Sequence, residues 1–181
     1  MIKDTSPFNG PLNVVCVKYG TKYGADYANK LYYGVAKHLS VAHTFTCFTE
    51  DPEGLDEKIS IKPLKHKWQG WWSKVHIFDP SSYSDNSQWI LYIDLDMIIT
   101  GSLDDLASMA GNKVHSFATL TTEEIFCENV DNGYNSSVMI FHRQKLEHLY
   151  RTLDSYYAHV MKYLMRFDHY LEMLVRNAEL V

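Results

Sequence analysis

The alternation of apolar and polar residues predicts short strands separated by helices. Residues 12–19, "LNVVCVKY", are almost entirely apolar and β-branched, which is typical of a strand buried on both faces of a parallel sheet. Residues 43–50 alternate like a second strand, closed by the turn "DPEG", and "KISIKPL" at 58–64 predicts a short third strand. Further strands are expected at 89–95, 115–120 and 136–142.

Helical periodicity fills the intervals between these strands. An i, i+4 apolar repeat over 27–39 indicates an amphipathic helix, and "WWSKVHIF" at 71–78 predicts a helix that ends before Pro80. Ser-Leu-Asp-Asp at 102–105 resembles a capping box, with the serine as N-cap and the last aspartate reaching back. Apolar residues keep helical spacing again over 145–164. Strands that alternate with helices indicate an α/β domain with a mostly parallel central sheet flanked by helices.

The composition is that of one globular domain. A chain of 181 residues can bury a continuous core, and 46% apolar with 22% charged residues excludes a disordered protein. The net charge of −5 gives no reason to expect a nucleic-acid partner.

Sequence features also bear on the cellular compartment. No apolar run approaches the roughly 18 residues of a membrane span, and the first residues lack the apolar segment of a secretory signal. The three cysteines have no paired spacing, which speaks against a disulfide framework or a zinc site. We therefore expect a cytoplasmic protein without an integral membrane segment.

Two aspartates directly follow a buried strand. "ILYIDLDMIIT" at 90–100 places Asp94 and Asp96 two residues apart among apolar neighbours. An unpaired carboxylate is costly to bury, but α/β proteins bind ligands where parallel strands end. Magnesium and manganese take hard oxygen ligands and bridge to phosphates. The pair is therefore a candidate metal site, unless one aspartate caps a turn and the other faces solvent.

Two catalytic uses of this pair are open. In a haloacid-dehalogenase-like phosphatase Asp94 would be the nucleophile and Asp96 the acid or base. Such enzymes usually place this strand near the N-terminus and follow the second aspartate with Gly-Thr, which "DMIIT" lacks. In the other use, the pair holds a metal ion on the diphosphate of a nucleotide-sugar, after a nucleotide-binding half and before an acceptor half. The layout favours this second use.

Four blocks of the sequence resemble one enzyme group when taken together and in order. They are "VKYGTKYGADYANKLYYGVAKHL" at 17–39, "WWSKVHIFDP" at 71–80, "WILYIDLDMIITGSLDDL" at 89–106 and "DNGYNSSVMIF" at 131–141. They resemble retaining glycosyltransferases related to glycogenin and galactinol synthase, and still more the bacterial and viral glycosyltransferase-like proteins. The match runs from about residue 12 to about 142, with a weaker continuation to about 177.

The resemblance implies a GT-A fold, a Rossmann-like fold for nucleotide-diphospho-sugar transferases, and an enzyme of that class. The donor would be a nucleotide-sugar, a UDP-sugar in preference to a GDP-sugar. The acceptor would be a hydroxyl of a glycan or another molecule, and transfer would retain the anomeric configuration. The alternative that remains open is a non-catalytic relic that binds the nucleotide-sugar without turnover.

Residues of the first block would bind the nucleotide by this resemblance. Val17, Lys18, Tyr19 and Thr21 match the first strand and turn that hold the base and ribose, with Tyr23 nearby.

The second and third blocks would bind the diphosphate and its metal. Lys74 matches the family's helix lysine near the donor diphosphate, where a compact cation offsets charge on the leaving group. Asp94 and Asp96 match the metal-binding D-x-D, with Leu95 between them, and the ion would be manganese or magnesium.

The last block and a later segment would face the reacting sugar. Asn135 and Ser136, with Ser137, match the family's Asn-Ser-Gly/Ala segment. Asp168 in "RFDHY" is matched to an aspartate that touches the sugar or the attacking hydroxyl, although His169 replaces the usual glutamine.

A tryptophan cluster precedes Lys74. Trp68, Trp71 and Trp72 suit stacking on an acceptor sugar, but we expect at least two of the three to pack in the core or in a lid.

One departure from the family concerns the third metal ligand. The family normally supplies a histidine from a later Gly-Lys-rich loop, whereas the late histidines here sit in no such motif: His142, His148, His159 and His169. Residues 1–181 are therefore expected to form a single glycosyltransferase-like domain of one of three kinds. It is the N-terminal part of a longer chain, a minimal enzyme with two protein ligands, or a degenerate domain.

Overall fold

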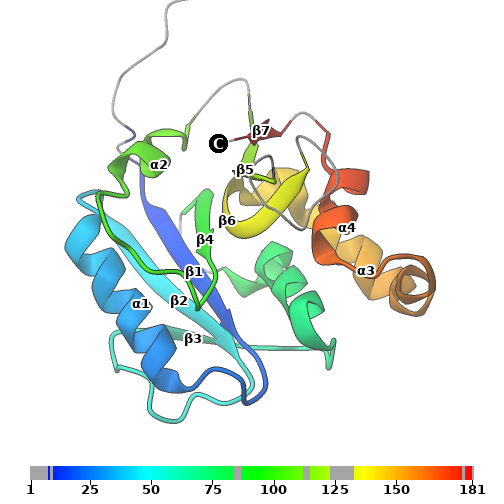
Figure 1. The fold of residues 1–181 in the computed structure, drawn as a ribbon, viewed down its shortest axis with the longest axis horizontal. Helices are drawn as coiled ribbons and strands as arrows, with labels where there is room; N and C mark the ends of the chain where they lie inside the picture. The colour runs from blue at the N-terminus through cyan, green and yellow to red at the C-terminus, as the bar shows by residue number, and fades with distance from the viewer. Residues whose placement is uncertain are drawn as a thin grey trace, which may run out of the picture.

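A seven-stranded sheet runs through the centre of the computed structural model, with helices on both faces (Figure 1). The structure describes residues 8, 10–83, 87–111, 115–122, 133–176 and 178–180. In chain order its elements are β1 (Leu12–Lys18), α1 (Ala25–His38), β2 (His43–Thr49), β3 (Ser60–Pro63), η1 (Gly70–Phe78), η2 (Pro80–Ser82), β4 (Trp89–Ile93), α2 (Asp104–Ser108), β5 (Phe117–Thr121), β6 (Tyr134–His142), α3 (Arg143–Tyr163), α4 (Phe167–Leu174) and β7 (Glu179–Leu180).

The strand order places a topological switch point beside β1. The sheet runs β3-β2-β1-β4-β6-β5-β7, and only β6 lies antiparallel to its neighbours. The chain leaves β1 for β2 on one side and later returns to β4 on the other. Pairing between β1 and β4 stops at Val15 and Tyr92, whereas β1 remains paired with β2 as far as Lys18 and Thr49. The carboxyl ends of β1 and β4 therefore separate at a topological switch point, where α/β sheets bind ligands.

Alternate residues of the strands build two separate cores. Val14 and Cys16 of β1 pack in the core beneath α1 and α2, whereas Val15 packs in the core beneath η1, α3 and α4. This two-sided burial explains the continuous apolar run in the first strand. It also corrects the prediction for β2, whose last five residues are buried on both faces and do not alternate.

The first turn of α2 differs from the predicted capping box. The helix begins after Leu103, which makes no side-chain cap. The Ser102 hydroxyl accepts the Asp104 N–H at 3.1 Å, but Asp105 does not reach back. The Asp104 carboxylate instead accepts the N–H and hydroxyl of Ser40 at 2.8 and 2.9 Å. A tertiary contact to the loop after α1 has replaced the local one.

Two of the three cysteines lie within the described residues. Cys16 and Cys47 lie opposite one another on β1 and β2 as buried free thiols, and Cys127 lies outside the described residues. No helix in the described part of the chain combines the length and hydropathy that crossing a bilayer requires.

The predicted helix before Pro80 is present as the 3₁₀-helix η1 rather than as an α-helix. It begins at Gly70, whose φ of +59° suits a residue without a side chain. The Ser73 hydroxyl donates to the Gly70 carbonyl at 2.7 Å, and His76 Nδ1 donates to the Ser73 carbonyl at 2.9 Å. Backbone bonds at the two ends of the helix span three residues, which is the repeat of a 3₁₀-helix: the Trp72 N–H donates to the Gln69 carbonyl at 3.2 Å and the Asp79 N–H to the His76 carbonyl at 3.1 Å.

His76 makes the stability of this segment dependent on pH. Its Nε2 accepts the His66 N–H at 3.0 Å, so the imidazole must be neutral to keep both of its bonds. Burial lowers the pKa of His76, against the opposing effect of its bond to Ser73. Because the native pKa lies below the ordinary value of 6.5, protonation favours the unfolded chain.

We therefore expect the free energy of unfolding to fall as the pH is lowered below about 6.5. Urea unfolding at a series of pH values measures this for the wild type and for His76→Gln, which keeps a donor and an acceptor but does not titrate. The variant should show a shallower decline over the same range. Parallel curves for the two proteins would contradict this role of His76.

Candidate functional site

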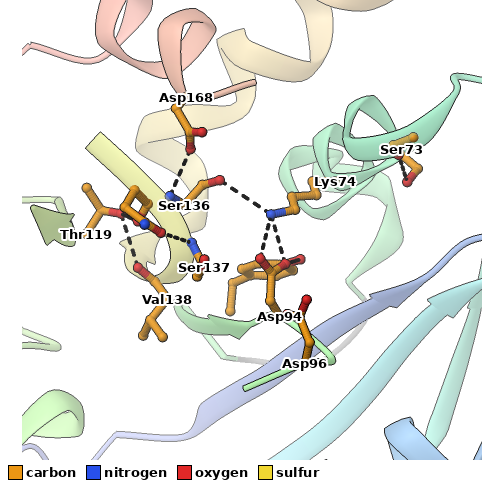
Figure 2. A network of polar contacts seen from close by, with 12 residues as sticks. Ser73, Lys74, Asp94, Asp96, Thr119, Ser136, Ser137, Val138 and Asp168 are labelled. Carbon is orange, nitrogen blue, oxygen red and sulfur yellow. Dashed lines mark hydrogen bonds and ion pairs between the residues drawn. The ribbon is translucent and has the colours of Figure 1, made fainter. Parts of the chain in front are cut away.

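Asp94 directly follows β4 at the switch point and is paired with Lys74. Lys74 Nζ lies 2.8 Å from each carboxylate oxygen of Asp94, and both side chains are mostly buried (Figure 2). The Asp94 N–H donates to the Ser137 carbonyl of β6 at 2.8 Å, which fixes the backbone on the side away from β1. The carboxylate that terminates the buried strand thus has a cation beside it within the protein.

Tyr92 gives Asp94 a second partner that the sequence analysis did not identify. Its hydroxyl donates to the Asp94 carboxylate. Burial, followed by the charge of Asp94, raises the pKa of Tyr92 well above its usual value, so the hydroxyl remains a donor. The sequence signal that could have revealed this contact is the two-residue spacing of Tyr92 and Asp94, since residues i and i+2 of a strand share a face.

Asp96 has a different environment from Asp94. It is exposed, and its carboxylate accepts the Tyr23 hydroxyl at 2.6 Å. Leu95 between the two aspartates is buried and holds this segment against the core beneath α1. The Tyr23 contact joins the loop before α1 to the segment after β4. It therefore links the chain segments that follow β1 and β4.

A bulge in β6 directs Ser136 toward Lys74. Thr119 of β5 pairs with Met139 and the next residue, Leu120, pairs with Asn135, so residues 136–138 have no counterpart on β5. The Thr119 hydroxyl contacts the carbonyls on both sides of the bulge, at 2.6 and 3.1 Å. Ser136 Oγ lies 3.4 Å from Lys74 Nζ. Bulges commonly redirect a side chain beside a functional site.

Asp168 and Asn135 hold the bulge from two sides. Asp168, in the first turn of α4, accepts the Ser136 N–H at 2.9 Å and has Arg166 at 3.9 Å (Figure 2). Asn135 Oδ1 accepts the Ser137 N–H at 3.0 Å. The site residues expected in the second half of the chain are therefore brought together with Lys74 and Asp94, although residues 94 and 168 are far apart in sequence.

The residues at the end of β1 differ in burial and in their contacts. Lys18 is buried, and its ammonium contacts the backbone carbonyl and the carboxylate of Asp51 at 2.9 and 3.1 Å. Its ammonium thus ties β1 to the end of β2. Val17 and Tyr19 are half-buried, and Thr21 is exposed. Asp51 is a further structural residue that the sequence analysis missed.

The charges and donor types at the D-x-D are compatible with a divalent cation. Asp94 and Asp96 supply hard carboxylate oxygens, and sites with one or two carboxylates completed by substrate phosphates are common for magnesium. Lys74 pairs with Asp94, and the charge of Lys22 interacts with both aspartates, so two lysines accompany the two carboxylates. Among the described residues no three His, Cys, Asp or Glu side chains form a group that could hold a metal ion. The third ligand expected in the family has therefore no counterpart within that part of the chain.

Solved structures of glycosyltransferases share this fold. The glycosyltransferase GlyE from Streptococcus pneumoniae TIGR4 superposes with a TM-score of 0.68 at 16% identity, over 96% of this chain and 45% of its own. The galactosyltransferase LgtC, solved with donor and acceptor sugar analogs, superposes with a TM-score of 0.63 at 13% identity, over 93% of this chain and 73% of its own.

These likenesses confirm the expected GT-A fold. This chain spans less than half the length of GlyE. No protein-family model and no curated protein matches the sequence.

The ion pair between Lys74 and Asp94 should contribute measurably to stability. Replacing Lys74 with Met leaves a mostly buried carboxylate without its cation, so we expect a loss of about 1–3 kcal/mol in the free energy of unfolding. Adding Asp94→Asn to that variant should recover part of the loss, because no unpaired charge remains. Urea unfolding of the two single variants and the double variant gives the coupling between the residues.

The matched control is Lys30→Met. Lys30 pairs with Asp26 on the surface of α1, where solvent screens the charges, so this change should have no measurable effect. Equal decreases in the free energy of unfolding for Lys74→Met and Lys30→Met would show that the ion pair of Asp94 with Lys74 does not stabilise the fold.

Proposed function

We propose that residues 1–181 form a single glycosyltransferase domain that moves a sugar from a nucleotide-diphosphate donor to an acceptor hydroxyl. The donor is a UDP-sugar in preference to a GDP-sugar, and transfer proceeds with retention. The observation that carries this proposal is the convergence of Asp94, Lys74, Ser136 and Asp168 at the switch point of a glycosyltransferase fold.

The base and ribose of the donor would lie over the end of β1. Tyr19, Thr21 and Tyr23 offer hydroxyls there, and none of the three is buried. Val17 contributes half-buried apolar surface. Lys18 would contribute through its backbone and by holding β1 against β2, since its ammonium already has Asp51 as partner.

Asp94 and Asp96 would hold manganese or magnesium at the diphosphate. When bound, such a cation would neutralise the negative charge that grows on the leaving nucleotide as the glycosidic bond breaks. Asp96 is the more available ligand, because its carboxylate is exposed and accepts the Tyr23 hydroxyl at the surface. Asp94 is held in place by Lys74 and Tyr92.

Lys74 and Ser136 would act on the departing phosphate and the reacting sugar. Lys74 Nζ contacts both Asp94 and Ser136, so its charge lies between the proposed diphosphate site and the β6 bulge. A compact ammonium there offsets charge on the leaving group. Asp168 and Asn135 would orient this bulge through the Ser136 and Ser137 N–H groups. Asp168 is also the candidate for contact with the attacking hydroxyl.

A binding-only relic of the same fold is the second candidate. It is favoured by one observation, the lack of a three-ligand metal group among the described residues. Nucleotide binding tests what the two candidates share, and turnover separates them. The phosphatase alternative is disfavoured by the fold, which aligns with glycosyltransferases.

Calorimetric titration of UDP and GDP, with and without manganese, tests the donor site. We expect metal-dependent binding of UDP, stronger than that of GDP, to the wild type. Asp96→Ala should abolish the metal-dependent part, because it removes an exposed carboxylate whose loss does not threaten the core. Asp105→Ala, which removes an exposed aspartate of α2, is the matched control and should bind as the wild type does. No binding of either nucleotide under any condition would overturn the proposal.

Turnover distinguishes an enzyme from a relic. We expect the wild type with manganese to release UDP slowly from UDP-glucose or UDP-galactose, as water takes the place of the acceptor. Asp168→Asn keeps a hydrogen-bond acceptor for the Ser136 N–H but loses its charge, so release should fall by about ten-fold or more. A coupled assay for free UDP measures both rates. UDP binding without any release would favour the relic.

A further inference from the structure

An open groove lies at the start of η1, beside the proposed reaction centre. It has a volume of about 500 Å³, and its walls are residues 69–72 on one side with Tyr157, Met161, Leu164 and Met165 on the other. This volume is within the range of about 300–1,000 Å³ that is typical of small-molecule sites. We propose that the groove binds a neutral sugar ring of the acceptor, with Trp71 as its stacking surface. The inference rests on the proposed function and names the acceptor class for it.

The three tryptophans of the cluster have different environments. Trp68 and Trp72 are 4% and 5% exposed and belong to the core beneath η1, whereas Trp71 is 53% exposed and forms part of the groove wall. Two tryptophans thus pack in the core, as expected, and the third remains available. Met165, which is 79% exposed, lines the same groove, so the exposed apolar surface gathers at one place, as it does at binding sites.

The 3₁₀ geometry of η1 places Trp71 and Lys74 on the same side of the helix. Side chains three residues apart eclipse one another in a 3₁₀-helix, and three residues advance the axis by about 6 Å. Lys74 contacts Asp94 and Ser136. A sugar stacked on Trp71 would therefore lie next to the proposed diphosphate and bulge, within reach of a neighbouring anomeric carbon.

The opposite wall of the groove also adjoins a residue of the proposed reaction centre. Leu164 and Met165 precede α4, whose first turn carries Asp168. Phe167, also in the first turn of α4, packs beside η1: its ring is 6.4 Å from that of Trp72 and 6.0 Å from Lys74 Nζ. Both walls thus end at residues of the proposed reaction centre, so the groove is positioned for the acceptor rather than for the nucleotide.

The lining chemistry indicates a neutral carbohydrate. Every lining residue in the described part of the chain is uncharged, which disfavours an acidic or basic ligand at this position. Gln69, Trp71 and Tyr157 carry polar groups on otherwise apolar walls. An apolar surface with a few hydrogen-bonding groups matches a sugar ring, which has C–H groups on its faces and hydroxyls around its edge.

The test follows each tryptophan separately by fluorine NMR of fluorotryptophan-labelled protein, with UDP and manganese present. The chain has four tryptophans, and the Trp71 signal is assigned with Trp71→Phe. The probes are maltotriose, lactose, cellobiose and N,N′-diacetylchitobiose. We expect at least one of them to shift the Trp71 signal in a saturable way. Trp71→Ala should weaken that sugar's binding about ten-fold, as measured by saturation-transfer NMR of the sugar.

Tyr163→Ala is the matched control. Tyr163 is an aromatic residue of α3 that is 81% exposed but does not line the groove, so its removal should leave sugar binding unchanged. Absence of a change in the Trp71 signal with all four sugars would overturn the inference. A change with n-octanol but with none of the sugars would also overturn it, because it would identify an apolar ligand. UDP binding without a sugar effect leaves the proposed function standing. Sugar binding without UDP binding removes the transferase function and keeps the groove as a carbohydrate site.

Discussion

The ion pair between Lys74 and Asp94 is the interaction on which the arrangement of the site depends. It joins η1 to the end of β4, two segments that the sheet alone does not connect. Tyr92 adds a donor from within the core, and the Asp94 N–H binds the backbone of β6. A carboxylate at the end of a fully apolar strand is tolerated here because Lys74 and Tyr92 both donate to it.

The bulge of β6 extends this arrangement to the C-terminal half of the chain. β6 pairs with β4 over residues 138–142 and with β5 over residues 134–135 and 139–141, and residues 136–138 form the bulge on the β5 side. Their N–H groups then point to Asp168 and to Asn135, while Ser136 Oγ approaches Lys74. One chain of contacts therefore runs from the switch point through η1 to α4. The groove lies between the start of η1 and the end of α3 with the segment that leads to α4, so η1 contributes both to this chain of contacts and to the groove.

Most of the fold was predictable because its signals are local. The buried run of β1 and the apolar stripe of α1 each follow from residue spacing, and the largely parallel sheet follows from their alternation with later elements. One error arose where a tertiary contact replaced a local one: Asp104 binds Ser40 instead of completing a capping box. The other concerns the kind of helix, because the backbone bonds of η1 span three residues, which the apolar pattern of 71–78 did not indicate.

The sequence by itself determined which chemical groups the site contains, because two aspartates at a strand end and a lysine before them are visible as a pattern. It did not determine which side chains contact one another. That Lys74 pairs with Asp94, that Tyr92 completes the pair and that Lys18 turns to Asp51 depend on distances between segments remote in sequence. Likewise, the sequence does not distinguish the three tryptophans within residues 68–72. Only the packing of the folded chain leaves Trp71 exposed. Burial and partner choice are properties of the folded whole, since each results from how several elements compete for the same space.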